Sequence, residues 1–471
     1  MKLLLTTFIL PLVINSCQSG TTKPETTAVE ASTANTAEPL IAPPDFPMTP
    51  DTIEVRGKFQ QGCDMPRMIK IAEHNELSAP WKEIAVNASG EFVYRTYLTE
   101  PRRIAMRTEK KANYDFIATT NEKIYQVDIN CFNKVEKLEL KGSAENTAYH
   151  PYALANRKFR NEIDSFARQD ISNPEVFAKL KNKITEYQKS IDGIASANPA
   201  TFTAKVLIAS EKLPEGSLNS AESLRKNWLQ REAFANPQLY NDFQGGRILS
   251  NYLAICDRKA DQFEVVDRLM KIGVKNPEAA KRLQQVAYNN FYNRHEEELV
   301  IAYIKWADAN PTAMYNQSVK MQLAKLKKVM PGSQLIDITL NDPKGTPKKL
   351  SDVVNSAKLT LLIFYSPTCD HCQLEIPQLK PIWDQYKSKG LKIYIIGFDA
   401  TAEEWAWFIK NKSYPEWTHV FEYPGYHPSD IYVVNYTPTF ILIDSQGKII
   451  TRLPELEDVK SDIPRLLQPL S

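Results

Sequence analysis

The fold of the C-terminal third is decided by one stretch of the sequence, which reads Leu361-Leu362-Ile363-Phe364-Tyr365-Ser366-Pro367-Thr368-Cys369-Asp370-His371-Cys372-Gln373-Leu374-Glu375-Ile376-Pro377. The apolar and aromatic run at its start, which extends back to Leu359, is typical of a buried strand. A short turn follows, and the chain then enters a helix at Cys369. The stretch therefore predicts a buried strand, Leu359–Tyr365, that leads into a helix whose first turn carries two cysteines.

Cys369 and Cys372 are spaced as Cys-x-x-Cys at the start of that helix. Unpaired backbone N–H groups and the helix dipole stabilise an anion at this end. We therefore expect the pKa of the Cys369 thiol to fall below the value of about 8.5 for a free cysteine. A thiolate attacks a disulfide to form a mixed disulfide, which a second thiol within reach resolves. The pattern indicates a redox-active pair, with Cys369 as the nucleophile and Cys372 as the resolving thiol.

Strands and helices alternate through the rest of the C-terminal third. Leu391–Phe398 is a second strand of the buried type. Thr439–Ile443 and Ile449–Arg452 form a hairpin through Ser445-Gln446-Gly447, with helices between and after the strands. This alternation predicts an α/β region over residues 330–471.

These features resemble the TlpA/ResA-type thioredoxin-like family of membrane-tethered disulfide reductases. The resemblance rests on the Cys-x-x-Cys-x-x-Glu-x-Pro run that begins at Cys369, on Pro438 in Tyr436-Thr437-Pro438-Thr439-Phe440, and on Ile441-Leu442-Ile443-Asp444 followed by Gly447. It implies a thioredoxin fold for residues 330–471, with the element order β-α-β-α-β-β-α.

The resemblance also implies roles for single residues. In this family a cis-proline faces the cysteine pair and leaves the preceding backbone free to pair with an extended substrate. We therefore expect Thr437 and Pro438 to bind substrate, together with His371. Glu375 is implied to donate and accept protons near the cysteines, and its position one helical turn after Cys372 places it on the same helix face.

Two positions depart from the pattern of typical thioredoxins. Ile363 stands where those proteins carry a buried aspartate, so Glu375 would serve alone as the acid–base group. The central dipeptide is Asp370-His371, and a histidine there resembles the oxidase DsbA. A charged His371 stabilises a neighbouring thiolate, whereas Asp370 opposes it through like-charge repulsion. The motif therefore leaves the redox direction open.

The N-terminus has the pattern of an export signal with a site for lipid attachment. Lys2 is followed by an apolar run at residues 3–14 and then by Asn15-Ser16-Cys17. A run this short is typical of a signal peptide rather than a membrane span. Cysteine at the cleavage position resembles the lipobox of bacterial lipoproteins. We therefore expect a signal peptide at 1–17, lipidation at Cys17 and, from its polar composition, a flexible tether at 18–50.

Two further regions separate the tether from the α/β region. Residues 51–145 alternate apolar and polar side chains and predict a small antiparallel β-sandwich of about seven strands. Residues 146–329 follow a helical period and predict a domain of about eight helices. Asn-Pro pairs fall at the breaks between these helices, because proline disfavours helix at the residue before it. The chain is thus expected to be multidomain, with a thioredoxin fold at its C-terminus.

Other function classes fit the sequence less well. The formal net charge of +2 gives no electrostatic case for a nucleic-acid partner. A zinc site would need a second Cys-x-x-Cys or a paired histidine motif. A peroxiredoxin would need Pro-x-x-x-Thr-x-x-Cys, but Pro367 lies only two residues before Cys369. We expect no metal and no diffusible cofactor. One alternative stays open, a binding or scaffold lipoprotein whose thioredoxin-like domain is redox-inactive.

Three cysteines lie outside these motifs. Cys63 and Cys131 fall at strand edges of the predicted β-sandwich and are candidates for a structural disulfide, whose pairing the sequence leaves open. Cys256 falls in a predicted helix and is typical of a small buried residue.

The sequence as a whole favours a lipid-anchored oxidoreductase of the bacterial cell envelope that faces the periplasm and reduces protein disulfides. Its expected partners are protein thiols and disulfides as substrates, and a membrane thiol protein as the electron donor.

Overall fold

The computed structural model of the chain describes residues 49, 51–60, 63, 66–74, 81–108, 113–132, 135–167, 169–257, 259–452 and 455–467. The predicted signal peptide with Cys17 and all of the predicted tether except Thr49 lie outside the described residues. The described residues belong to one compact unit, residues 45–471.

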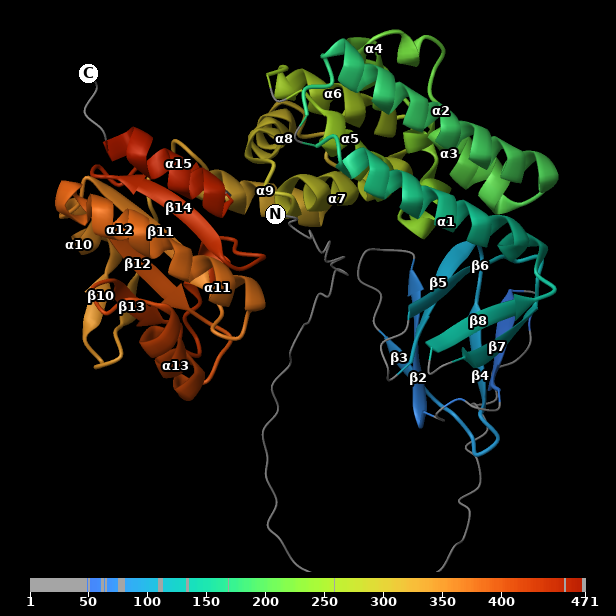
Figure 1. The fold of residues 1–471 in the computed structure, drawn as a ribbon, viewed down its shortest axis with the longest axis horizontal. Helices are drawn as coiled ribbons and strands as arrows, with labels where there is room; N and C mark the ends of the chain where they lie inside the picture. The colour runs from blue at the N-terminus through green and yellow to red at the C-terminus, as the bar shows by residue number, and fades with distance from the viewer. Residues whose placement is uncertain are drawn as a thin grey trace, which may run out of the picture. The chain divides into compact units, whose positions relative to one another are not determined.

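The first region, residues 51–141, holds two four-stranded sheets in the part that the structure describes (Figure 1). One sheet has the order β4-β1-β7-β8, with strands β4 (Glu91–Tyr97), β1 (Thr52–Phe59), β7 (Ile124–Phe132) and β8 (Val135–Lys141). The other has the order β3-β2-β5-β6, with strands β3 (Lys82–Ala85), β2 (Met68–His74), β5 (Arg102–Arg107) and β6 (Asn113–Ala118). Buried side chains of both sheets, such as Val55 and Ile71, form one hydrophobic cluster.

Two details of this region differ from the sequence prediction. The described residues form eight strands rather than about seven, and β3 shows no alternation because none of its side chains is fully buried. One strand pair, β1 with β7, is parallel. An alternating pattern reports which face of a strand is buried, not the direction of its neighbour, so the parallel pair was not predictable from it. Cys63 is disulfide-bonded, but the side chain of Cys131 lies outside the described residues, so their pairing stays a prediction.

The described residues between 144 and 329 form mainly helices. The longer helices are α1 (Ala144–Asp164), α2 (Pro174–Ala197), α4 (Ala221–Trp228), α5 (Gln244–Ile255), α6 (Gln262–Gly273), α7 (Pro277–Asn293), α8 (Glu297–Ala309) and α9 (Gln317–Leu326). Between or after them lie the short turns η1 (Thr203–Ile208), α3 (Ala209–Glu211), η2 (Ser217–Asn219), η3 (Glu232–Ala235), η4 (Pro237–Asp242) and η5 (Lys327–Val329).

The Asn-Pro pairs explain several helix ends. Asn173, Asn236 and Asn276 each cap a helix start, where the side-chain oxygen accepts a backbone N–H and the following proline occupies the first helical position. Asn198 and Asn310 instead stand at the ends of α2 and α8. The pairs therefore lie at helix boundaries, as the sequence predicts.

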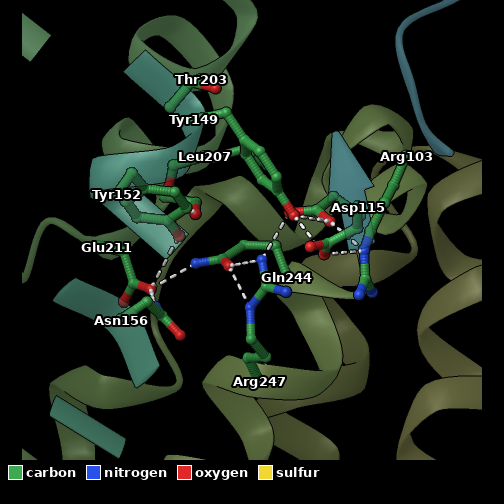
Figure 2. A network of polar contacts seen from close by, with 12 residues as sticks. Arg103, Asp115, Tyr149, Tyr152, Asn156, Thr203, Leu207, Glu211, Gln244 and Arg247 are labelled. Carbon is green, nitrogen blue, oxygen red and sulfur yellow. Dashed lines mark hydrogen bonds and ion pairs between the residues drawn. The ribbon is translucent and has the colours of Figure 1, made fainter. Parts of the chain in front are cut away.

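A buried polar network, in which Arg103 and Tyr149 take part, joins the first region to the helices (Figure 2). One of its centres is Asp242 at the end of η4. The Asp242 side chain is fully buried and accepts a hydrogen bond from Arg247 Nη2 at 2.7 Å. Arg103 of β5 lies 3.7 Å away from it and pairs with Asp115 of β6 at 2.6 Å. The Tyr149 hydroxyl of α1 lies within 3.2 Å of both carboxylates. These contacts balance the buried Asp242 and the partly buried Asp115 with two arginines.

Glu211 is the second centre of the network (Figure 2). It is 3% exposed, and its Oε1 accepts hydrogen bonds from Asn156 Nδ2 at 2.8 Å and from Gln244. The Tyr187 hydroxyl lies 3.2 Å from the same oxygen, and the buried Arg231 guanidinium lies 3.6 Å from Oε2. No sequence motif predicts this network, because its members come from separate helices and strands.

The C-terminal region contains a five-stranded sheet of order β13-β12-β11-β14-β15. Its strands are β11 (Leu359–Tyr365), β12 (Leu391–Gly397), β13 (Thr418–Phe421), β14 (Thr439–Asp444) and β15 (Ile449–Arg452). Its helices are α10 (Leu350–Asn355), α11 (Asp370–Glu375), α12 (Lys380–Tyr386), α13 (Ala402–Lys412), α14 (Pro428–Ile431) and α15 (Leu456–Leu467), with short 3₁₀ turns η6 (Ile376–Leu379) and η7 (Lys387–Lys389). A separate two-stranded sheet joins β9 (Thr339–Asn341) and β10 (Pro347–Lys349).

Strand β11 is buried along its whole length, as its apolar run predicts. Leu361 and Ile363 pack on one face of the sheet in a cluster with α12 and α15. Leu362 and Phe364 pack on the other face, in a cluster that continues into the helical region and includes Tyr292 of α7. One face of this sheet therefore shares its core with the helical region. No helix in the described part of the chain is long and apolar enough to cross a membrane.

Candidate redox site

The two cysteines lie where β11 passes into α11. Cys369 is the residue before the first turn of α11 and is half-buried, whereas Cys372 lies inside that turn and is fully buried. Both are free thiols. The buried strand fixes the start of the helix, so one sulfur stays accessible while the other stays in the core.

The pKa values of the two thiols shift in opposite directions. The pKa of Cys369 is lowered to about 5, chiefly by a hydrogen bond with the Cys372 thiol, against partial burial; Thr437 and the backbone N–H groups of Cys372 and His371 add to the lowering. The pKa of Cys372 is raised far above its ordinary value by burial and then by its interaction with Cys369. At neutral pH the pair therefore holds one thiolate, on Cys369, and one thiol, on Cys372.

Glu375 lies one turn further along α11. Its Oε1 is 3.8 Å from His371 Nδ1, and the Glu375 side chain is 31% exposed. Burial raises the pKa of Glu375, His371 opposes this rise, and the negative charge of Cys369 adds to it. A carboxyl group with a raised pKa beside a thiolate is suited to exchange protons with it.

The second sequence signature meets the first at the Cys369 sulfur. The Thr437–Pro438 peptide bond is cis. The carbonyl oxygen of Thr437 lies 3.5 Å from Cys369 Sγ, and Pro438 is buried. His371 stays exposed on α11. The structure thus brings together Cys369, Cys372 and Thr437. His371 lies between the two cysteines in the chain, Glu375 lies one turn further along α11, and Pro438 follows Thr437. Cys17 lies outside the described residues.

Two features near the site were not predicted. Tyr365 ends β11, and its hydroxyl is buried. Burial strongly raises the pKa of this phenol, an interaction with the Trp405 side chain lowers it, and the charge of Cys372 adds to the rise. His295, from the helical region, stacks on Tyr436, which precedes Thr437, with ring centroids 4.1 Å apart. Tyr365 ends the predicted buried strand, directly before the turn that leads to Cys369, so its place near the cysteines could have been predicted from the sequence. His295 has no such signal, since it is distant in sequence.

The C-terminal part of the chain is similar in sequence to known proteins. Residues 331–452 match the AhpC/TSA family. A relative from Bacillus cereus, the thiol-disulfide oxidoreductase ResA, is 29% identical over 150 residues, which cover 31% of this chain and 83% of the relative.

Solved structures with similarity to the chain include two from Bacteroides. The thioredoxin domain of a thiol-disulfide oxidoreductase from Bacteroides vulgatus is 28% identical, with a TM-score of 0.27, and the match covers 29% of this chain and 98% of that one. A thioredoxin-like protein from Bacteroides caccae is 18% identical, with a TM-score of 0.42, and the match covers 52% of this chain and 92% of that one.

The C-terminal fold, the cysteine pair and the sequence relatives together define a thioredoxin-like protein. Within that class, the C-terminal region is similar to the thiol–disulfide oxidoreductases of the TlpA/ResA type.

Proposed function

We propose that the chain reduces disulfides in other proteins of the cell envelope, with Cys369 and Cys372 as its dithiol. The observation that carries the proposal is the opposite shift of the two thiol pKa values, because a ready nucleophile beside a protected thiol is what two-step exchange needs.

The reaction consists of two exchanges. The Cys369 thiolate attacks one sulfur of the substrate disulfide; a bond forms between Cys369 and that sulfur, and the other substrate sulfur leaves as a thiolate. Cys372 then loses its proton and attacks Cys369 Sγ, which releases the second substrate thiolate and leaves a Cys369–Cys372 disulfide. The substrate gains two electrons and the cysteine pair loses two. In the mixed disulfide Cys369 no longer carries a charge, so one cause of the raised Cys372 pKa is removed.

Glu375, Thr437, Pro438 and His371 are proposed to assist these exchanges. Glu375 accepts the proton of Cys372 and later returns it to a product thiolate, for which its raised pKa is suited. An extended substrate segment pairs with the backbone before Pro438, close to Cys369, and the exposed His371 lines the same approach.

The protein is further proposed to act from a lipid anchor on the periplasmic side of the envelope. What supports this is the sequence pattern of residues 1–17, with Cys17 as the acylated residue, and the polar tether at 18–50. A membrane thiol protein would then reduce the Cys369–Cys372 disulfide after each cycle. Labelling with a radioactive fatty acid should mark the wild-type chain in cells but not Cys17→Ala, and equal labelling of the two would exclude this anchor.

The proposed domain order is a β-sandwich at 51–145, a helical domain at 146–329 and a thioredoxin-like domain at 330–471. Two sheets with a shared core support the first. The Ser143 cap, which starts helix α1 at Ala144, supports the boundary to the second.

Trapping the mixed disulfide tests the proposed chemistry. Cys372→Ser should accumulate a covalent complex with a protein that contains a disulfide, and a reductant should release it. The matched variant Cys369→Ser should form no such complex, because the other thiol of the pair, Cys372, is buried. A Cys372→Ser chain that forms no complex while Cys369 is reduced would leave only the scaffold alternative.

A further inference from the structure

The C-terminal region, which carries the cysteine pair and is the redox region of the chain, is contacted by the helical region. The contact is made at residues 292–297, the α7–α8 corner. The Tyr292 hydroxyl donates a hydrogen bond to the carbonyl oxygen of Val433. Arg452 Nη2, from β15, also donates to this carbonyl oxygen and to the Tyr292 hydroxyl, at 3.1 Å in each case. At the other end of the corner, Glu297 Oε2 accepts the backbone N–H of Arg452 at 2.6 Å. The corner therefore binds two segments of the redox region at once.

Val433 has a backbone conformation that needs support. Its φ is 52°, in the left-handed region, which a β-branched side chain rarely adopts. The residue is 5% exposed, and its carbonyl oxygen takes the hydrogen bonds from Tyr292 and Arg452, which are both fully buried. The neighbouring helical region thus supplies one of the groups that hold this conformation.

The supported segment leads directly to the reacting sulfur. From Val433 the chain passes through Asn435 and Tyr436 to Thr437, whose carbonyl oxygen lies 3.5 Å from Cys369 Sγ. The His295 ring stacks on the Tyr436 ring with an interplanar angle of 22°. Burial lowers the pKa of His295 to about 4, so the stacked ring is neutral at neutral pH. Both ends of the short segment 433–436 are therefore held by the α7–α8 corner.

We propose that Tyr292 and His295 are positioning residues of the redox site, which hold the segment 433–437 so that Thr437 stays against Cys369. The inference rests on the proposed dithiol chemistry and assigns the helical region a part in it. Because the Thr437 side chain is one of the groups that lower the pKa of Cys369, a displaced segment changes the reactivity of that sulfur as well as the binding of an extended substrate.

Two mild substitutions test this proposal in the full chain. Tyr292→Phe keeps the ring and removes only the hydroxyl. His295→Asn removes the stacked ring but keeps a residue that tolerates the φ of 60° found there. Tyr303→Phe is the control, since this buried hydroxyl of α8 donates to the carbonyl oxygen of Gln284 at 3.2 Å, away from the segment 433–437.

The readout is the rate of Cys369 alkylation as a function of pH, together with the melting temperature. In the double variant Tyr292→Phe/His295→Asn we expect the pKa of Cys369 to rise by half a unit or more, which means roughly 3-fold less thiolate at a pH below both pKa values. Tyr303→Phe should keep the wild-type profile even if it lowers the melting temperature. If the double variant does not fold, each single variant is expected to shift the profile in the same direction.

A folded variant with the wild-type pH profile would overturn the positioning role. That result differs from a failure of the proposed function, in which the wild-type chain itself would lack a reactive thiolate on Cys369.

Discussion

Cys369 and Cys372 share one turn of chain, yet their surroundings give them different chemistry. Cys369 has backbone N–H groups and the Cys372 thiol as donors, while Cys372 is enclosed by the core. The sequence predicts the lowered pKa of Cys369, because a cysteine directly before a helix lies near the positive end of the helix dipole. It does not predict how strongly the pKa of Cys372 is raised, since the burial of Cys372 depends on residues packed from elsewhere in the fold.

The largest cause of the low Cys369 pKa can be tested by substitution of its partner. Cys372→Ala removes the donor, so the pKa of Cys369 should rise from about 5 by roughly one unit or more, because a hydrogen bond to a charged group contributes about 1.5–3 kcal/mol. Cys372→Ser keeps a donor and should raise the pKa less. The pH dependence of alkylation measures both, and identical pKa values for the two variants would show that Cys372 does not donate to the thiolate.

Among the strands of the C-terminal sheet, β11, β12, β14 and β15 could be predicted from the sequence, but the edge strand β13 could not. The predicted bounds of β11 and β15 are confirmed, and β12 and β14 differ by one residue at one end. β13, with only four residues, was missed, because it includes His419 and lacks a long apolar run. Buried central strands are recognisable from continuous apolar sequence, whereas short edge strands depend on their neighbours.

The start of α8 should give the protein a stability that depends on pH. Burial raises the pKa of Glu297 from 4.5 to about 7, while the backbone N–H of Arg452 opposes the rise. Because the pKa of Glu297 is higher in the folded chain than in the unfolded chain, the protonated carboxyl group stabilises the folded state. This stabilisation is fully present below pH 4.5 and is lost as the pH rises through 7.

Glu297→Gln removes this titration and keeps an acceptor for Arg452. Between pH 4.5 and 8 the wild type should therefore lose about 2–3 kcal/mol more unfolding free energy than the variant. Denaturant unfolding at a series of pH values measures the difference. Parallel curves for the two proteins would mean that Glu297 ionises as an ordinary carboxylate.

Contacts between regions were the least predictable part of the molecule. Tyr292 and Val433, or Arg103 and Asp242, are far apart in sequence and carry no shared motif. Their pairing results from how whole helices and sheets pack. The sequence predicts the redox role of the cysteine site, but it predicts no role for the helical region. In the structure, the helical region contacts the segment that leads to Thr437.

The buried network between the first region and the helices should be important for stability. Asp242→Asn removes a fully buried charge and leaves Arg247 and Arg103 without it, so we expect a loss of about 3–5 kcal/mol. Asp308→Asn is the control, because its surface pair with Lys327 at 2.8 Å should contribute about 0–1 kcal/mol. Urea unfolding measures both, and equal midpoints for the two variants would contradict a stabilising network.

The central claim is that Cys369 and Cys372 form a working dithiol, and the reactivity of Cys369 tests it most directly. In the reduced, folded chain, the rate of Cys369 alkylation should be constant at neutral pH and fall as the pH drops through about 5, with a reversible dithiol–disulfide couple in redox buffer. Cys369→Ser should abolish both signals. A Cys369 that never alkylates in the folded chain, or that titrates like a free cysteine, would contradict the account.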